Sequence, residues 1–282
     1  MHDWLHQLQT DQRVLDLCSG TGSFSPAGLA CSVVALDEDT AAFENAAPLQ
    51  PGPHYRAFGK SDQIPFSNAS FDLVICHHGL EHIPTVETTL REIGRVLKPD
   101  GRLVVSIPNG YGLCDGIYRF VFEGGGHVNR FTRQRAVELV ERCAGVRLQR
   151  WHKLYSSFAY LYRLAEALDS HPMSLPKRAR ALDRLPRAAV YKGQRALYRA
   201  TRLADRLFHT NLAVYGWAFY FGHPSDGYSS DAAQEQPAYL NVCVYCGSGH
   251  PAANMNRGSR SFWRCSACDT VNPFVKPFRN AI

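Results

Sequence analysis

Residues 14–23 constrain the fold of this chain more than any other stretch. An apolar, β-prone run surrounds Asp16, and Gly20 and Gly22 follow before a helix-compatible stretch opens at Phe24. Glycines at these positions let the backbone turn sharply and approach a ligand closely, which a Cβ would obstruct. The pattern predicts a strand, a tight turn and a helix that border a nucleotide-binding crevice.

Asp37 adds a second constraint. It ends the apolar run of residues 31–37, which predicts the next strand, and it follows Asp16 by about 20 residues. An acid at this distance, at the tip of the second strand, binds the ribose diol in dinucleotide-binding folds. The two segments together predict a nucleotide site.

From residue 13 to about residue 152 the sequence resembles the class I S-adenosylmethionine-dependent methyltransferases, in particular those that methylate small molecules. Five segments in the family's order and spacing carry the resemblance. They are the loop Asp16-x-Cys18-x-Gly20-x-Gly22, the acid Asp37, residues 64–74 (IPFSNASFDLV), residues 80–83 (LEHI) and residues 96–103 (VLKPDGRL). The family has glycine where this chain has Cys18, so only the two later glycines match as loop-forming positions.

The resemblance implies S-adenosylmethionine as the cofactor and assigns several positions to its site. The family places an acid for the adenine amino group where this chain has Lys60, so Asp62, two residues on, is the replacement candidate. A solvated loop acid is the alternative reading of Asp62. The implied cofactor-binding residues are Asp16, Cys18, Gly20, Gly22, Asp37, Asp62 and His77.

Repeated strand, helix, strand patterns predict an α/β fold, a doubly wound Rossmann-like sheet of seven strands. Residues 71–76 are continuously apolar, as expected for a strand buried on both faces of a parallel sheet. Residues 133–144 are a predicted helix, with Thr132 as its N-cap and Gly145 as its stop. Together with the resemblance, these elements lead us to expect a methyltransferase domain over residues 1–222.

The seventh strand does not follow the sixth directly, because residues 155–211 separate the two apolar runs. This segment looks helical, so we expect a helical insertion between strands 6 and 7. From residue 150 to residue 210 the chain carries 13 Lys and Arg against four acids, a net charge of +9. The charge fits a lid that meets an anionic acceptor, a lipid headgroup or nucleic acid, and equally a solvated helical face.

Residues 223–238 are polar and predict a linker, and residues 239–282 predict a small zinc-ribbon-like module. Two Cys-x-x-Cys pairs separated by 18 residues are the four-thiolate zinc pattern. Four thiolates leave no coordination position open for water, so the predicted Zn²⁺ is structural. The predicted metal ligands are Cys243, Cys246, Cys265 and Cys268.

Three histidines are candidates for a catalytic general base, which methyl transfer needs only when the acceptor must lose a proton. An imidazole titrates near neutrality, which suits this task. His78 and His82 follow the predicted strand of residues 71–76, and His127 lies in a Gly-rich segment that resembles a loop of the same family. A structural or substrate-orienting role is the alternative for each of them.

Two functions remain open on the sequence. The first is methyl transfer to a small-molecule, lipid-linked or saccharide-linked acceptor. The second is methylation of RNA (rRNA or tRNA), in which the basic insertion and the zinc module would bind the nucleic acid. Base-amino methyltransferases carry an Asn/Asp-Pro-Pro-aromatic motif after the fourth strand, and Cys76-His77-His78-Gly79 at that place argues against the second function.

The composition leads us to expect a cytoplasmic protein. No run approaches 18 apolar residues, and the N-terminus lacks the basic-then-apolar pattern of a signal peptide. Positive charge is concentrated in residues 150–210, whose net +9 exceeds the +6 of the whole chain, which leaves open a peripheral contact with the inner face of a membrane.

Overall fold

The computed structural model describes most of the chain up to residue 223 and two short segments beyond it. The described residues are 2–5, 7–20, 22–24, 26, 28–40, 53–156, 158, 161, 176–223, 262–264 and 271–273.

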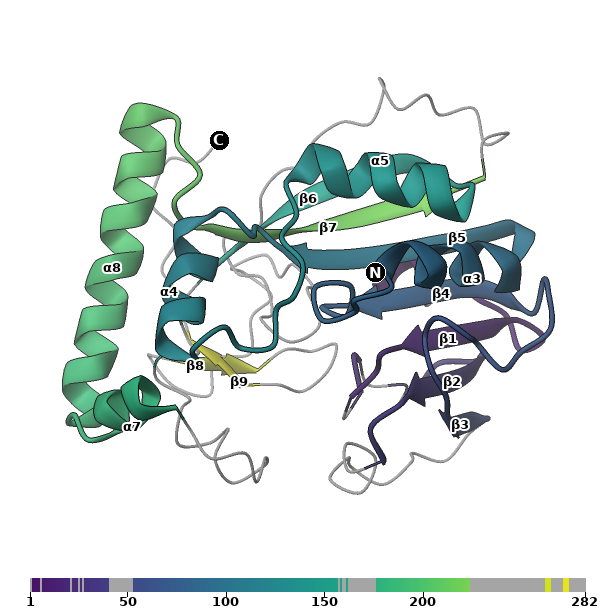
Figure 1. Cartoon of the computed structure of the whole chain (residues 1–282), viewed down its shortest axis with the longest axis horizontal. Helices are drawn as coiled ribbons and strands as arrows, with labels where there is room; N and C mark the ends of the chain where they lie inside the picture. Colours follow the sequence, from purple (N-terminus) through teal and green to yellow (C-terminus); the bar gives the residue numbers. More distant parts are fainter. Residues whose placement is uncertain are drawn as a thin grey trace.

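A seven-stranded sheet forms the body of the protein, in the order β3-β2-β1-β4-β5-β7-β6 (Figure 1), which confirms the predicted α/β fold. The parallel strands are β1 (Arg13–Leu17), β2 (Ser32–Asp37), β3 (His54–Phe58), β4 (Phe71–His77) and β5 (Leu97–Pro108). β7 (Val214–Gly222) runs antiparallel to its two neighbours, β5 and β6 (Arg147–Tyr155). The strand order reverses between β1 and β4, and open α/β sheets bind ligands outside the carboxyl ends of the strands at such a point.

Alternate residues of a strand point to opposite faces of the sheet, so both faces here carry apolar side chains. In β1, Leu15 and Leu17 belong to the core cluster that includes residues of α3 (Val86–Val96) and α5 (Arg133–Ala144), whereas Val14 belongs to a second cluster. In that second cluster Trp4, from α1 (His2–Leu5), packs edge to face on Tyr220 with 5.2 Å between ring centroids. Burial on both faces explains why the predicted strands are continuously apolar.

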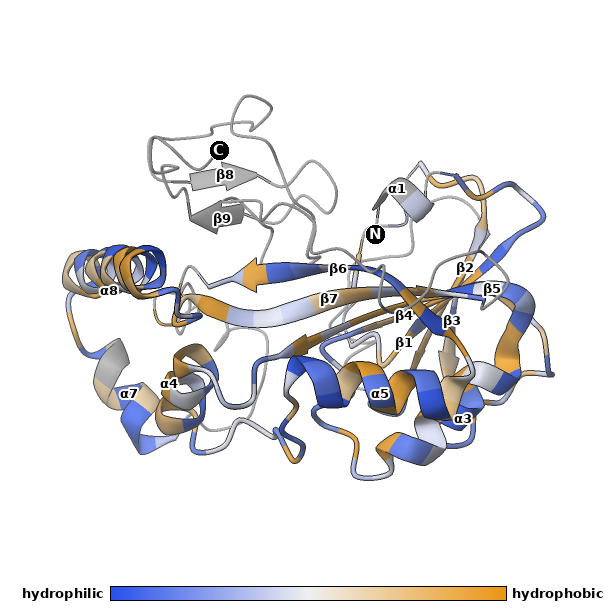
Figure 2. Cartoon of the chain, turned by 90° about the horizontal axis from the view of Figure 1, so that it is seen from above, coloured by the Kyte–Doolittle hydropathy of each residue, from blue (hydrophilic) through white to orange (hydrophobic). Residues whose placement is uncertain are grey.

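α3 and α5 lie side by side on one face of the sheet (Figure 2). Gly94 permits their close approach, because a Cβ at this position would lie 2.5 Å from the carbonyl oxygen of Ala144. The predicted caps of α5 are confirmed. The Thr132 hydroxyl accepts a hydrogen bond from the N–H of Arg135, and Gly145 takes a φ of +71°, in the left-handed region that favours glycine.

Between β6 and β7 the structure describes two helices, α7 (Lys177–Asp183) and α8 (Arg187–Phe208). Figure 1 shows both helices, together with α4 (Leu113–Val121), beyond the carboxyl ends of the parallel strands. Tyr198 of α8 packs in a small cluster with Cys114 of α4 and with Phe158. Helices from two distant parts of the sequence therefore flank the carboxyl edge of the parallel strands.

The C-terminal part of the chain contributes two short antiparallel strands, β8 (Phe262–Arg264) and β9 (Val271–Pro273). The four predicted zinc ligands lie outside the described residues, as does nearly all of the predicted linker. Within the described ranges, no helix is both long and apolar enough to cross a membrane.

Candidate active site

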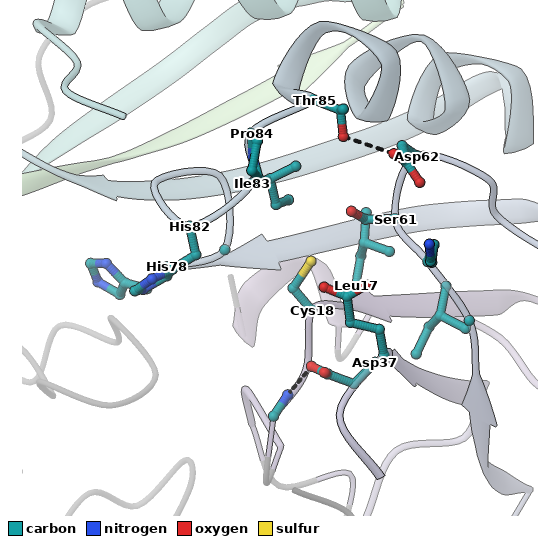
Figure 3. A pocket seen from close by; sticks show the side chains of 16 residues that line it. Leu17, Cys18, Asp37, Ser61, Asp62, His78, His82, Ile83, Pro84 and Thr85 are labelled. Carbon is teal, nitrogen blue, oxygen red and sulfur yellow. Dashed lines mark hydrogen bonds between the residues drawn. The ribbon is translucent and has the colours of Figure 1, made fainter. Parts of the chain in front are cut away.

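A cavity of about 410 Å³ opens at the switch point, bordered by the carboxyl ends of β1, β2 and β4 (Figure 3). Its size lies within the range of small-molecule sites in proteins. Its wall includes six of the residues predicted from the sequence, namely Cys18, Gly20, Asp37, Asp62, His78 and His82. The other predicted residues, Asp16, Gly22, His77 and His127, are not part of the cavity wall.

Asp37 joins two of the segments that form the cavity. One carboxylate oxygen, Oδ2, accepts the N–H of Gly20 at 2.7 Å, and the other, Oδ1, accepts the N–H of Asp39 at 2.9 Å. The parallel register pairs Leu17 with Leu36, so the loop after β1 lies directly beside the tip of β2. Asp37 is therefore a fixed, partly exposed anion on the cavity wall, suited to hold a diol.

Cys18 stands where the family has glycine, and its backbone explains that preference. Its φ is +55°, a left-handed value that costs a residue with a Cβ roughly 1–2 kcal/mol. The side chain packs beside Cys76 and Gly79, and a Cβ on Gly79 would lie 2.9 Å from both the Cβ of Cys18 and the Sγ of Cys76. A hydrogen bond with Cys18 and burial raise the pKa of Cys76 well above its usual value, so this thiol stays protonated.

Asp16 lies behind the loop rather than on the cavity wall. It is 3% exposed, and its Oδ2 accepts the N–H of Ser23 at 3.0 Å, which ties the far end of the Gly-rich turn to β1. Its Oδ1 is buried without a hydrogen-bond partner. Burial raises the pKa of Asp16 to about 7.

Asp62 lines the cavity opposite Asp37. Its Oδ2 accepts a hydrogen bond from the hydroxyl of Thr85, the residue that precedes α3 (Figure 3). Ser61 is linked in the same way to Thr89 of α3, with 3.2 Å between the hydroxyl oxygens. These bonds fix the loop after β3 against the start of α3, so the Asp62 carboxylate has one defined orientation at the wall.

The two histidines at the end of β4 separate into different environments. His77 bonds through Nδ1 to the hydroxyl of Ser106, its register partner in β5, so its side chain faces the neighbouring strand instead of the cavity. His78 lines the cavity, and its Nδ1 lies 3.1 Å from Oε1 of Glu81. The His78 ring also stacks on Tyr215, with 5.6 Å between centroids.

His127 reaches the same end of the cavity from a distant segment. Three consecutive glycines, residues 124–126, have φ values of +100°, +58° and +75°, and they turn the chain back toward the loop after β4. The His127 ring lies 4.9 Å from the ring of His82, centroid to centroid, and its Nδ1 lies 2.9 Å from Oδ1 of Asp115. The structure thus gathers His78, His82 and His127 around Glu81, although the cavity wall itself includes only the first two.

Asp115 of α4 is a site residue that the sequence did not single out. Burial alone would raise its carboxyl pKa, yet hydrogen bonds with His127 and Arg119 hold that pKa below its usual value. Arg119 also donates from Nη1 to the carbonyl oxygen of His127 at 2.7 Å. The spacing of Asp115 and Arg119, four residues apart on a helix, was the available signal, but it is common to many solvent-exposed helices.

The segment that forms this site is similar to a known family of domains. A family model described as a methyltransferase domain matches residues 15–105, from β1 into β5. Every residue of the cavity wall falls within this match. The matched segment, the seven-stranded sheet and the site support a class I S-adenosylmethionine-dependent methyltransferase architecture.

Particular relatives match over about a third of the chain. The uncharacterised methyltransferase YcgJ of Bacillus subtilis is 30% identical over 105 residues, which is 35% of this chain and 42% of that protein. A demethylmenaquinone methyltransferase of Renibacterium salmoninarum is 37% identical over 99 residues, 34% of this chain and 40% of that protein. The chain therefore spans about two fifths of the length of these curated relatives.

A solved structure shares the fold over a longer part of the chain. A candidate sarcosine dimethylglycine methyltransferase from Galdieria sulphuraria superposes with a TM-score of 0.52 at 19% identity, covering 78% of this chain and 84% of that one. At this identity the likeness concerns the fold alone.

Proposed function

We propose that this protein transfers a methyl group from S-adenosylmethionine to a small-molecule acceptor. The observation that carries the proposal is the cavity at the sheet's switch point, with the Asp37 carboxylate fixed at the tip of β2 and facing it. The methyltransferase-domain match over residues 15–105 covers the whole cavity wall and supports the same function.

Different residues in and beside the cavity would bind the cofactor and accept a proton from the acceptor. Asp37 and the Gly20 turn would hold the ribose, and Asp62 would accept from the adenine amino group. S-adenosylmethionine supplies a methyl group already activated on a sulfonium. Holding reactants in line in such a site can supply up to roughly 7–11 kcal/mol of the barrier. An acceptor hydroxyl or amine would give its proton to an imidazole among His78, His82 and His127.

The acceptor that best fits is a small molecule, alone or linked to a lipid or a saccharide. A relative named for demethylmenaquinone, a small-molecule acceptor, supports this class over RNA. α7 and α8 carry many basic residues and lie beyond the carboxyl ends of the parallel strands (Figure 1), which suits an anionic acceptor or a peripheral contact with an anionic membrane from the cytoplasmic side. Methylation of RNA remains the alternative that the same basic helices would serve.

For the C-terminal region we propose a structural zinc ion held by Cys243, Cys246, Cys265 and Cys268. The spacing of the two cysteine pairs supports it. Protein purified without added metal should contain one zinc per chain by elemental analysis. A well-folded preparation with under about a tenth of an equivalent contradicts a zinc site with the expected high affinity.

Calorimetry with S-adenosylmethionine tests the proposed function. Replacing Asp37 with alanine removes two hydrogen bonds to a charged acceptor, each worth about 1.5–3 kcal/mol, so affinity should fall well over tenfold. Asp37→Asn, which keeps the shape, should lose less. Asp11→Ala removes an equal charge from an exposed turn and is the control. Unchanged affinity in Asp37→Ala, or no binding by the native protein, would overturn the proposal.

A further inference from the structure

We propose that Glu81, His82 and His127 form a binding site for a divalent first-row transition-metal ion beside the cavity. One carboxylate oxygen of Glu81 and one ring nitrogen from each histidine lie within 4.8 Å of one another. Two histidines and one carboxylate are the ligand set of many Zn²⁺ and non-haem Fe²⁺ centres.

In both histidine rings a hydrogen bond engages Nδ1, which leaves Nε2 as the nitrogen available to a metal. Nδ1 of His127 bonds to the Asp115 carboxylate, and Nδ1 of His82 bonds to the carbonyl oxygen of Gly126 at 3.1 Å. Both partners only accept, so each Nδ1 carries the hydrogen, and in the neutral ring Nε2 keeps its lone pair. A ring held in this way by a carboxylate or a carbonyl is the usual environment of a metal-binding histidine.

The buried carboxylate of Glu81 is an independent indication of a ligand. Glu81 is 1% exposed, and its Oε2 has no hydrogen-bond partner, while Oε1 lies 3.1 Å from Nδ1 of His78. Burying a polar oxygen without a partner costs free energy, and burying a charged one costs more. A cation between Glu81 and the two imidazoles would satisfy this oxygen.

The two loops that carry the ligands are fastened to each other. The N–H groups of Val128 and Asn129 donate to the carbonyl oxygen of Glu81 at 2.8 and 3.0 Å. The Asn129 amide donates to the carbonyl oxygens of Leu80 at 2.9 Å and Ile83 at 2.6 Å. Ligands of a tetrahedral Zn²⁺ at about 2.1 Å lie roughly 3.4 Å apart, so the site needs only a small closing movement. The exposed side chain of His82 has room for it.

The position of the metal suggests an acceptor class, and this step rests on the proposed function. His82 belongs to the cavity wall, so an ion bound to it would lie at the cavity's edge. Three protein ligands leave a coordination position open, and a hydroxyl bound there loses its proton more easily. The acceptor would then be an oxygen nucleophile that coordinates the metal, such as a phenol or an enol. Its proton would pass to solvent or to His78, its oxygen would form the bond to the methyl carbon as the bond from that carbon to sulfur breaks, and S-adenosylhomocysteine would leave.

Titration of the full chain with Co²⁺, followed by visible absorption, tests the site without any turnover. A site of two imidazoles and a carboxylate gives ligand-field bands in the visible, whereas thiolate sites in the C-terminal region add charge-transfer bands in the near ultraviolet. We expect Glu81→Gln and His127→Ala to weaken the absorption bands of the thiolate-free component, which is the site made of two imidazoles and a carboxylate. Their affinity for Co²⁺ at that site should fall about tenfold or more. His209→Ala, an exposed histidine at the end of α8, should titrate like the native protein.

Circular dichroism and urea unfolding of the same preparations show whether each variant is folded, and S-adenosylmethionine binding is measured separately. Glu81→Gln preserves the size of the side chain, so it remains informative if His127→Ala fails to fold. Native-like Co²⁺ titration in Glu81→Gln, or no thiolate-free component in the native protein, would overturn the metal site. A native protein that binds S-adenosylmethionine but shows no Co²⁺ bands from a site without thiolates would leave the proposed function standing. A native protein that shows these bands but does not bind S-adenosylmethionine would leave the metal site standing.

Discussion

Gly126 lies directly against the His82 ring at the candidate metal site. Its φ is +75°, and a Cβ added there would lie 3.2 Å from Nδ1 of His82, the atom that bonds to the Gly126 carbonyl oxygen. Gly124, two residues earlier, has a φ of +100° but open space around the position of a Cβ. Alanine variants of Gly126 and Gly124 therefore distinguish the effect of backbone strain from the effect of a contact with His82.

Replacing Gly126 with alanine should therefore displace the His82 ring, whereas Gly124→Ala should only strain the turn. Both variants should lose about 1 kcal/mol or more of stability in urea unfolding, because alanine disfavours positive φ. Co²⁺ binding should weaken in Gly126→Ala alone. Equal metal binding by the two variants would show that the contact with His82 does not position a ligand.

Asp16 makes stability depend on pH in a direction opposite to that of an ion-paired acid. Its pKa rises from 3.8 to about 7 on burial, so between these values the folded state binds more protons than the unfolded state. The contribution of Asp16 to stability is therefore largest below its unfolded pKa and falls as pH rises toward 7. An Asp16→Asn variant lacks this titration.

The free energy of unfolding of the native protein minus that of Asp16→Asn should fall between pH 5 and pH 8, by on the order of 1–4 kcal/mol. Urea unfolding at the two pH values measures the difference, and other titrating groups cancel because both proteins share them. A difference that stays constant or rises would mean that Asp16 is ionised in the fold at neutral pH.

At the scale of elements, the contact between α3 and α5 depends on one glycine. Gly94→Ala would place a Cβ 2.5 Å from the carbonyl oxygen of Ala144, a backbone atom that cannot move aside cheaply. Overpacking of this kind typically costs 1–3 kcal/mol. Gly193, on the exposed side of α8, has open space where the methyl group of an alanine would lie and is a matched helical control.

We expect Gly94→Ala to destabilise the protein by about 1–3 kcal/mol and Gly193→Ala to stabilise it by up to about 1 kcal/mol, because alanine has the higher helix propensity. Thermal and urea unfolding measure both. Native stability in Gly94→Ala would mean that the two helices separate without penalty.

At the scale of the whole molecule, positive charge is concentrated in one region, because the +9 of residues 150–210 exceeds the net +6 of the entire chain. Lys177, Arg180 and Arg184 are exposed on and after α7, whereas Arg178 packs over Phe120 of α4 with its Cζ 4.3 Å from the ring centroid. The first three can therefore be neutralised without disturbing the contact between α4 and α7.

Replacing Lys177, Arg180 and Arg184 with glutamine should weaken binding to vesicles that contain anionic phospholipid, and the loss should shrink as salt is raised. S-adenosylmethionine affinity should stay within about twofold, or roughly 0.4 kcal/mol. A triple variant of Arg91, Arg135 and Arg147, on α3, α5 and β6, removes equal charge and should bind vesicles normally. Loss of cofactor binding in the first variant would place the insertion in the cofactor pocket, and stronger binding to RNA than to vesicles would favour the RNA alternative.

The parallel strands, the caps of α5 and the position of Asp37 at the tip of β2 could be predicted from the sequence, because each depends on short-range chemistry. A strand buried on both faces must be continuously apolar, as in β4. The residue that ends a helix in the left-handed backbone conformation is usually glycine, as at Gly145. Asp37 was predictable because parallel neighbours bring the ends of β1 and β2 together. His77 shows the limit, because adjacent residues leave a strand in opposite directions and only His78 reaches the cavity.

The tertiary structure alone decided the grouping of Glu81, His82, His127 and Asp115. These residues come from three segments. No local preference brings the turn of residues 124–126 onto the loop after β4. That contact depends on hydrogen bonds from Asn129 to residues more than 40 positions away and on α4, which supplies the partner of His127. Local propensity and periodicity specify elements, whereas long-range packing and the satisfaction of buried polar groups specify which side chains meet.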